Sequence, residues 1–403
     1  MNIPFSPPYV DQSVIDEVIS SLNSGWITTG PKVKELEDRI KEFTEVPNVL
    51  CVNSWTSGAI LILKWLGIKE GDEVIIPAYT YSATALAVLH AGGKPVMVDV
   101  EDDFNISVSE IRKAITSKTK AILPVDIAGW PCDYKSIMEL VTEDAIRQIF
   151  TADSVVQKKL NRILVIADAA HSFGSKSEQK SPATFADICI FSLHAVKNLT
   201  TAEGGAICIN MPQQFNNDEL YKYLRMMTLN GQTKDAFTKT KAGGWRYDIV
   251  MQGMKINMPD ICAAIGLAQI KKYDYLLSER KRVFERYSNA FSKCKWALLP
   301  PQDTSDKQSS YHLYALRIKS ITEHQRDKII EEITTYGVAV NVHFIPMPML
   351  SLFKDIGYSI DNFPISYKNY CGEISLPIYP QLTIEQVDYV INSVISSVNK
   401  IVS

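Results

Sequence analysis

Short apolar runs alternate with stretches of helical pattern through the first half of the 403-residue chain. Several runs are continuous in Val, Ile and Leu, which is typical of strands buried on both faces of a sheet. Ser57–Trp65 and Ser82–His90 follow two of these runs and are predicted as helices entered through Ser/Thr caps. The alternation predicts an α/β fold with a seven-stranded, mostly parallel sheet, its strands at Val49–Val52, Glu73–Ile76, Pro95–Val100, Ala121–Val125, Ile163–Asp168, Asp187–Phe191 and Gly205–Ile209.

The pattern changes near Ile261. Beyond it we expect a long helix, a β-like run and another helix, at residues 264–291, Tyr314–Ile318 and His324–Thr335. The chain is also long for a single hydrophobic core. We therefore predict a large domain with an N-terminal arm over residues 1–265 and a smaller α/β C-terminal domain over residues 266–403.

The stretch Glu139–Arg162 is polar and helical in pattern, and it is longer than one crossover helix needs. We interpret it as an insertion that forms surface helices.

Composition narrows the functional classes. The net charge of −3 without a basic stripe gives no support for binding nucleic acid or an anionic membrane. The most apolar region, Val74–Val100, is broken by Pro77, Lys94 and Pro95, so no membrane span is predicted. Seven scattered cysteines without a C-x-x-C pair favour reduced thiols in the cytoplasm and argue against a metal site. The first residues also lack the pattern of a signal peptide.

Lys197 follows the predicted strand that ends at Phe191 and lies in a small-polar loop that ends in Gly204-Gly205. Its amine is nucleophilic only when deprotonated, which burial beside a cofactor favours. Asp168 ends another apolar strand, where its carboxylate could keep a pyridine nitrogen protonated. This pairing is what a pyridoxal phosphate (PLP) enzyme needs, although an isolated Lys197 would be read as a solvated loop residue.

Hydroxyl side chains mark a candidate phosphate site. Thr56 and Ser57 come directly after a strand and open a helix, where free backbone N–H groups bind anions. Ser192 precedes Lys197 by five residues and could reach the same phosphate. Taken alone, Thr56 and Ser57 fit plain helix N-caps, and Ser192 fits a strand-end cap.

Two ring side chains complete the candidate cofactor site. Tyr81 follows the strand that ends at Pro77 and could lie flat on a pyridine ring; a buried core tyrosine is the alternative. His171 lies three residues after Asp168 and could hydrogen-bond a phenolic oxygen, or be a satisfied loop histidine. Each candidate lies at or just after the C-terminal end of a strand, where open α/β sheets bind ligands.

The ordered set of motifs resembles the DegT/DnrJ/EryC1/StrS family of PLP-dependent nucleotide-sugar aminotransferases, which have the type I (aspartate aminotransferase) fold. The resemblance runs nearly end to end, through the segments at residues 24–31, 71–75, 95–99, 253–260, 343–346 and 376–380 besides those of Asp168 and Lys197. It implies that Lys197 forms the Schiff base with PLP, which alternates with pyridoxamine phosphate in the cycle. Asp168 would then pair with the ring nitrogen. The further cofactor contacts that it implies are His171 at the phenolic oxygen, Tyr81 on the ring, and Thr56, Ser57 and Ser192 at the phosphate.

The resemblance also implies a homodimer with shared active sites, since Asn257 matches an asparagine that reaches the neighbouring subunit's phosphate. The expected substrates are an amino donor, L-glutamate by analogy, and a nucleotide-linked keto sugar. The segments at residues 26–30 and 194–205 are most similar to enzymes that aminate the sugar's C4, such as the 4-amino-4-deoxyarabinose enzyme of lipid A modification. The candidate substrate residues are Trp26, Thr28, His312 and His343.

Other functions on the same scaffold stay open. These are a C3 sugar aminotransferase, an amino-cyclitol aminotransferase and a non-catalytic regulatory protein. Lys197 argues against the dehydratases of the family, which carry His in its place. Two departures are Ala167, where the family usually has Glu, and Pro348, where a histidine is common; the second affects the expected substrate contacts.

Overall fold

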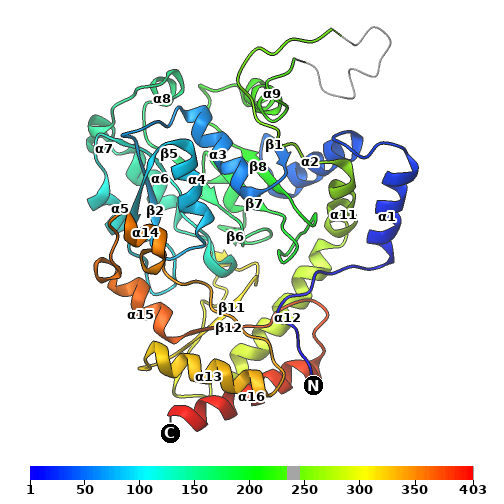
Figure 1. Ribbon diagram of the computed structural model, residues 1–403, viewed down its shortest axis with the longest axis vertical. Helices are drawn as coiled ribbons and strands as arrows, with labels where there is room; N and C mark the ends of the chain where they lie inside the picture. Colours follow the sequence, from blue (N-terminus) through cyan, green and yellow to red (C-terminus); the bar gives the residue numbers. More distant parts are fainter. Residues whose placement is uncertain (234–245, 403) are drawn as a thin grey trace.

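A seven-stranded sheet forms the centre of the computed structural model, which describes residues 1–233 and 246–402 (Figure 1). The strand order is β1-β8-β7-β5-β4-β2-β3. Strand β8 runs antiparallel to both its neighbours, and the other neighbouring strands are parallel. The strands are β1 (Asn48–Val52), β2 (Glu73–Pro77), β3 (Lys94–Val98), β4 (Thr119–Ile122), β5 (Leu164–Asp168), β7 (Ile188–Ser192) and β8 (Gly205–Ile209).

All seven predicted strands are present, and β4 differs most from its predicted bounds. It ends at Ile122 rather than at Val125. Pro124 has no N–H to donate to a neighbouring strand, which explains the early end. Val125 still forms an isolated bridge with Asp168, so the chain stays beside β5 beyond the end of β4.

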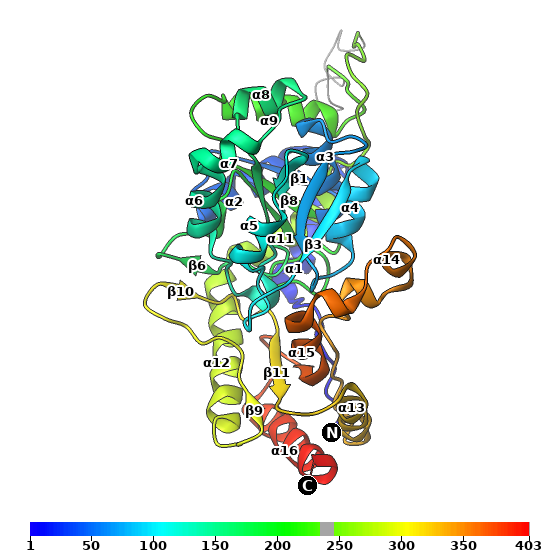
Figure 2. The ribbon, with the colours of Figure 1, turned by 90° about the vertical axis from the view of Figure 1, so that its left-hand side faces the viewer.

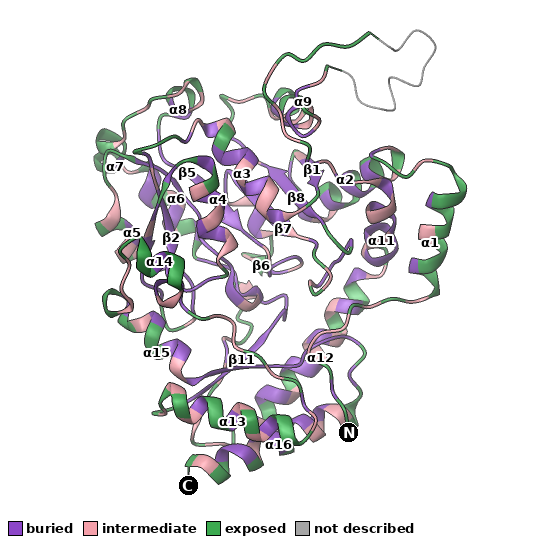
Figure 3. Cartoon of the chain, viewed as in Figure 1, coloured by how far each residue is buried: buried purple, intermediate pink, exposed green. Residues whose placement is uncertain are grey.

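Both faces of the sheet are covered, as the continuous apolar runs predicted (Figure 3). In β5, Val165 and Ala167 belong to one hydrophobic cluster, whereas Leu164 and Ile166 belong to another. The first cluster contains residues of α2 (Pro31–Thr44), α6 (Tyr134–Thr142) and α11 (Asp260–Ile270), and the second contains residues of α3 (Trp55–Leu66) and α4 (Ala83–Ala91). Helices α1 (Gln12–Asn23), α2, α3, α4 and α5 (Val108–Ala114) precede or connect these strands, and α9 (Asn217–Met227) follows the last of them.

The polar stretch before β5 forms three short helices, α6 (Tyr134–Thr142), α7 (Asp144–Ile149) and α8 (Val155–Leu160). The expectation of surface helices is correct only in part. Ile137, Leu140 and Val141 on α6 are buried in the core, because its apolar residues recur at helical spacing. Gln157 on α8 is also buried and donates to the Leu66 carbonyl.

The long helix expected after residue 261 is two helices, α11 (Asp260–Ile270) and α12 (Tyr273–Phe291). The backbone of Lys272 leaves the helical region, with φ −122° and ψ 17°. Helix α11 packs on α1 and α2, whereas α12 extends toward the C-terminal elements (Figure 2).

The C-terminal elements surround a small sheet in the order β12-β11-β9. Its core contains residues from Val283 to Val398, and Ile3 of the N-terminal arm. Phe353 packs in one of the two clusters of the large sheet, so the chain from η3 to α15 returns there. The boundary at residue 265 stays a prediction. The elements are β9 (Ala297–Leu298), β11 (Tyr314–Ile318), α13 (Glu323–Thr335), η3 (Met347–Met349), α14 (Ser351–Asp355), η4 (Ile360–Asn362), α15 (Pro364–Gly372), β12 (Glu373–Leu376) and α16 (Ile384–Val402).

Shorter elements are the paired strands β6 (Lys176–Ser177) and β10 (Lys307–Gln308) and the turns η1 (Ile127–Gly129) and η2 (Pro182–Thr184). Among the described residues, no helix is long and apolar enough to span a bilayer.

Candidate active site

A cavity of about 440 Å³ opens at the C-terminal ends of β5 and β7. The beginnings of α3 and α4 form another part of its wall. Eight of the twelve residues predicted from the sequence line it: Thr56, Tyr81, Asp168, His171, Ser192, Lys197, His312 and His343. The fold therefore brings together side chains that lie up to 287 positions apart in the sequence.

Asp168 is the last residue of β5 and is 3 % exposed. Its Oδ2 accepts a hydrogen bond of 2.9 Å from the Thr84 hydroxyl, and its Oδ1 accepts one of 3.2 Å from the Ala170 N–H. Burial raises the pKa of Asp168 to about 7, against the opposing effects of these two donors and of Lys197. The carboxylate is thus held in one orientation, ready to pair with a cationic ring nitrogen.

Thr84 was not predicted as a site residue. It lies in the first turn of α4, which points its hydroxyl at the end of the neighbouring β5. The feature of the sequence that could have pointed to Thr84 is a hydroxyl residue at the start of a predicted helix that follows a strand. The sequence alone could not show that its partner is 84 residues away.

Lys197 lies in the loop between β7 and β8, where its backbone N–H bonds the His194 carbonyl at 2.9 Å. Burial lowers the pKa of Lys197 to about 8, although the Asp168 carboxylate acts in the opposite direction. Part of the lysine is then an unprotonated amine near neutral pH, as a nucleophile or a base requires.

His171 is buried beside the same cavity, and its Nδ1 accepts the Ala128 N–H at 3.3 Å. Burial, with Lys197 and His343 nearby, lowers the pKa of His171 well below its usual value. The ring is therefore neutral with its proton on Nε2, which makes Nε2 a hydrogen-bond donor.

A small cradle forms where α3 begins. Ser54 caps the helix: its Oγ accepts the Ser57 N–H at 3.1 Å and donates to the Ser57 hydroxyl at 2.9 Å. A Cβ on Gly205 would come within 2.7 Å of the Ser54 and Trp55 backbone, so only glycine fits there. The cradle, the neighbouring Ser192 and the helix N-terminus together fit a phosphate group. Ser57 itself does not line the cavity.

Aromatic side chains form the outer wall. Tyr81 is 62 % exposed, and its ring centroid lies 5.7 Å from that of Phe344. His343 stacks on Phe5 at 5.4 Å, and its Nδ1 bonds the Ser375 hydroxyl at 2.9 Å. Tyr81 is thus available to a planar ligand rather than buried in the core. The contacts of Phe344 with Tyr81 and His171 were not predicted.

Trp26, Thr28 and Asn257 lie outside the cavity, close to one another around Thr29. The Trp26 indole donates to the Thr29 carbonyl at 3.2 Å, and the Asn257 amide donates to the Thr29 hydroxyl at 2.5 Å. Thr28 is exposed, and its carbonyl accepts the first N–H of α11. Within one subunit these side chains do not reach the cofactor cavity, and their predicted roles stay predictions.

The two departures from the family pattern have simple structural positions. Ala167 is fully buried in the core of the sheet. Pro348 is buried in the turn η3 and does not line the cavity.

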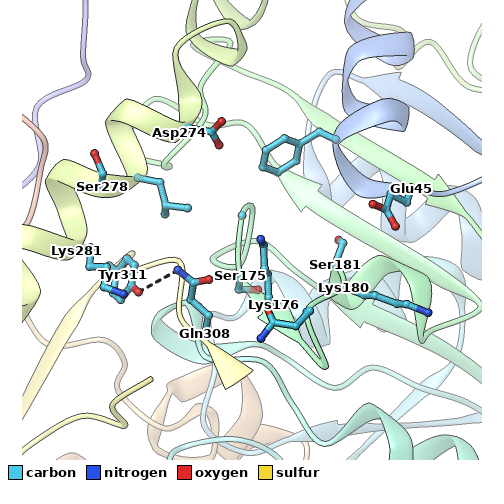
Figure 4. A pocket seen from close by; sticks show the side chains of 14 residues that line it. Glu45, Ser175, Lys176, Lys180, Ser181, Asp274, Ser278, Lys281, Gln308 and Tyr311 are labelled. Atoms are coloured by element: carbon cyan, nitrogen blue, oxygen red, sulfur yellow. Dashed lines mark hydrogen bonds between the residues drawn. The ribbon is translucent and has the colours of Figure 1, made fainter. Parts of the chain in front are cut away.

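A second cavity, of about 360 Å³, lies between α12, the β6 hairpin and the end of α2 (Figure 4). None of the predicted site residues lines it. Tyr311 faces this second cavity, where Gln308 donates to its hydroxyl at 3.3 Å, whereas the next residue, His312, faces the first. The chain at residues 309–313 is thus the wall between the two cavities.

The cavity with Lys197 and Asp168 fits pyridoxal phosphate. It offers a buried amine with a lowered pKa, a buried carboxylate, a neutral imidazole that donates from Nε2, and a phosphate cradle. These groups match the aldehyde, ring nitrogen, phenolic oxygen and phosphate of that cofactor.

Comparisons with known proteins agree with this site. The model of the DegT/DnrJ/EryC1/StrS aminotransferase family matches residues 8–395. The PLP form of the putative sugar aminotransferase Spr1654 from Streptococcus pneumoniae is 40 % identical, covers all of both chains and superposes with a TM-score of 0.95. Its form with pyridoxamine phosphate (PMP) is 42 % identical, with the same TM-score.

Two curated proteins are similar over nearly their whole length. The spore coat polysaccharide biosynthesis protein SpsC of Bacillus subtilis is 32 % identical over 97 % of this chain and 96 % of its own. The UDP-4-amino-4-deoxy-L-arabinose–oxoglutarate aminotransferase of Shewanella sediminis is 30 % identical over 97 % of each chain. The predicted type I fold, enzyme class and cofactor are confirmed, and the chain belongs to the DegT/DnrJ/EryC1/StrS family of PLP-dependent sugar aminotransferases.

Proposed function

We propose that this enzyme transfers the amino group of L-glutamate to the C4 keto carbon of a nucleotide-linked deoxysugar. The observation that carries the proposal is that the buried Lys197 amine and the Asp168 carboxylate line the same cavity. The Asp168 carboxylate there accepts a hydrogen bond from the Thr84 hydroxyl. The similarity to the UDP-4-amino-4-deoxy-L-arabinose–oxoglutarate aminotransferase favours C4 and a nucleotide sugar. The similarity to SpsC favours a role in making surface polysaccharides.

The roles of the residues follow from their protonation. PLP, when bound, supplies an electron sink for the carbon that carries the amine. Lys197 Nζ would take a proton from that carbon and deliver it to the cofactor carbon that receives the amine, because burial keeps part of the lysine unprotonated. Asp168 holds a proton on the ring nitrogen, and His171 Nε2 donates to the phenolic oxygen. Thr56 and Ser192, which line the cavity, bind the phosphate, and Tyr81 covers the ring. Ser57, which does not line the cavity, supports the same helix start through its hydrogen bonds with Ser54.

A homodimer with shared active sites is part of the proposal. Asn257 and Trp26 both hydrogen-bond to Thr29 and lie outside their own subunit's cavity, and we assign them to the site of the neighbouring subunit. Several apolar side chains that are near them in the sequence are exposed: Ile15, Ile19 and Leu22 on α1, and Ile27, Ile249 and Val250. An apolar surface of this kind suits a contact between copies.

The cytoplasm is the proposed compartment. All seven cysteines are free thiols, and four of them are buried. This usage suits a reducing environment.

The substrate assignment is tested with purified holoenzyme, L-glutamate and a panel of nucleotide-linked keto sugars with the ketone at C3 or C4. Mass spectrometry identifies the aminated sugar, and NMR locates the amine. We expect amination at C4 of at least one UDP sugar. Amination at C3 alone would move the enzyme to the C3 class, and no product from any sugar would contradict the proposal.

A further inference from the structure

The segment Ser309–Leu313 touches each loop that carries a catalytic group. Its N–H groups bond the carbonyls of Ala128 and Gly129 in turn η1. The Ser310 hydroxyl donates to the His171 carbonyl at 2.6 Å. Asn198, which directly follows Lys197, contacts the same segment: its side chain hydrogen-bonds to the Ser310 carbonyl and to the His312 ring. His312 therefore sits in a frame fixed by the loops of His171 and Lys197.

Asn198 determines which nitrogen of His312 carries the proton. Its amide nitrogen donates to the Ser310 carbonyl at 2.6 Å, which leaves the amide oxygen facing His312. That oxygen lies 3.0 Å from Nδ1 of His312 and can only accept, so Nδ1 must donate. Both side chains are buried, Asn198 at 8 % and His312 at 5 % exposed.

The neighbouring His171 has the opposite arrangement. Its Nδ1 accepts the Ala128 N–H, so its proton is on Nε2. The two rings lie 4.4 Å apart between centroids, with 35° between their planes. Burial lowers the pKa of His312 well below its usual value, and the nearby His171, Lys197, Arg280 and His343 act in the same direction. His312 is therefore neutral. The cavity wall thus carries one imidazole donor beside one imidazole acceptor.

We propose that Asn198 is a positioning residue that fixes His312 as a neutral hydrogen-bond acceptor at Nε2, and that this atom binds a hydroxyl group of the sugar substrate. This inference rests on the proposed function for its ligand. A lone pair at Nε2 accepts an O–H and repels a carboxylate or phosphate oxygen. A sugar carries hydroxyl groups beside the carbon that is aminated, whereas L-glutamate presents carboxylates apart from its amine. His312 therefore distinguishes the two substrates of one cavity.

The positioning is tested by NMR on holoenzyme labelled with ¹⁵N-histidine, in which the His312 signals are identified by their loss in His312→Gln. We expect the wild-type ring to carry its proton on Nδ1. Asn198→Asp places a negative charge beside Nδ1 and should yield the doubly protonated ring, while Asn198→Ser should move the proton to Nε2. The control is Asn210→Asp, whose side chain also donates to backbone carbonyls but lies at the opposite end of β8 from the cavity. A wild-type proton on Nε2 would overturn the proposal.

The ligand of His312 is tested by measuring two half-reactions of the PLP form separately. The loss of the cofactor's visible band monitors each of them. The probes are L-glutamate and UDP-4-amino-4-deoxy-L-arabinose. His312→Leu should weaken the apparent affinity for the sugar about tenfold and leave that for L-glutamate within about twofold, as expected for one lost hydrogen bond. His312→Gln keeps an amide oxygen as acceptor and should recover part of the sugar affinity.

Equal losses with both probes would contradict the assignment of His312 to the sugar. A wild-type enzyme that reacts with L-glutamate but with no amino or keto sugar nucleotide would contradict the proposed function and the ligand of His312 together. The NMR experiment needs no substrate, so in that case it still decides whether Asn198 positions His312.

Discussion

The Thr84 hydroxyl donates a hydrogen bond of 2.9 Å to Oδ2 of Asp168. This bond joins the first turn of α4 to the end of β5, and both residues line the cavity. It opposes the rise in the pKa of Asp168 that burial causes. The charge of the carboxylate, and with it the protonated state of a bound pyridine ring, thus depends on a residue outside the sequence motifs.

Replacing Thr84 by Val should remove the donor without changing the shape of the side chain. A hydrogen bond to a charged group contributes about 1.5–3 kcal/mol, so we expect kcat to fall by one to two orders of magnitude. Steady-state kinetics with L-glutamate measure the effect, and Thr84→Ser is the matched control that keeps the hydroxyl. A Val variant with the wild-type kcat would show that this bond does not support Asp168.

Asp168 should make the apoprotein less stable as the pH rises. Its folded pKa, about 7, lies above the ordinary value of 3.8, so between these pH values the native state holds a proton that the unfolded state has lost. The free energy of unfolding therefore falls from about pH 4 to pH 7.

Asp168→Asn removes this titration and keeps the shape of the side chain. We expect the apo variant to be more stable than the wild type by a few kcal/mol at pH 8, with a smaller difference at pH 5. Urea unfolding of both proteins at the two pH values measures this. A difference that does not change with pH would mean that the carboxyl group titrates normally.

Gly205 should be essential to the phosphate cradle. A Cβ at this position would meet the Ser54 and Trp55 backbone at 2.7 Å, which flexible side chains cannot relieve. Gly205→Ala should lower the free energy of unfolding by about 2–4 kcal/mol and weaken PLP binding at least tenfold. Thermal unfolding and PLP titration give the two values. Unchanged PLP affinity in a folded variant would place the phosphate elsewhere.

The shared active site can be tested by mixing two defective subunits. Lys197→Ala and Asn257→Ala damage different subunits' contributions to one site if Asn257 reaches across the dimer. After co-refolding, half of the dimers would be mixed, each with one intact site, so we expect about a quarter of wild-type activity. Activity no higher than the mean of the separate variants would mean that Asn257 acts within its own subunit.

Continuous apolar runs made the strands predictable, because a strand buried on both faces needs apolar side chains in sequence. They also drew attention to Asp168, the last residue of β5, and to Lys197, in the loop after β7. The break between α11 and α12 was not predictable: apolar residues continue on both sides of Lys272 at helical spacing. Packing of α11 on α1 and α2 and of α12 on the C-terminal core separates the two helices.

Contacts between distant segments were the main omission. Thr84 and Asp168 are 84 residues apart, and Asn198 and His312 are 114 apart. Neither Thr84 nor Asn198 has a local pattern that differs from a helix-start or loop residue. His312 was a candidate substrate residue, but its protonation depends on Asn198, and only the fold brings these two side chains together.

The most direct test of the account is the absorption spectrum of the purified protein with PLP, before and after L-glutamate, beside Lys197→Ala. The wild type should show the visible band of PLP bound to a lysine, and L-glutamate should remove that band. The variant should bind PLP without the lysine-linked band and show no turnover. A Lys197→Ala variant that keeps transaminase activity, or a wild type that never forms the band, would contradict the assignment of Lys197.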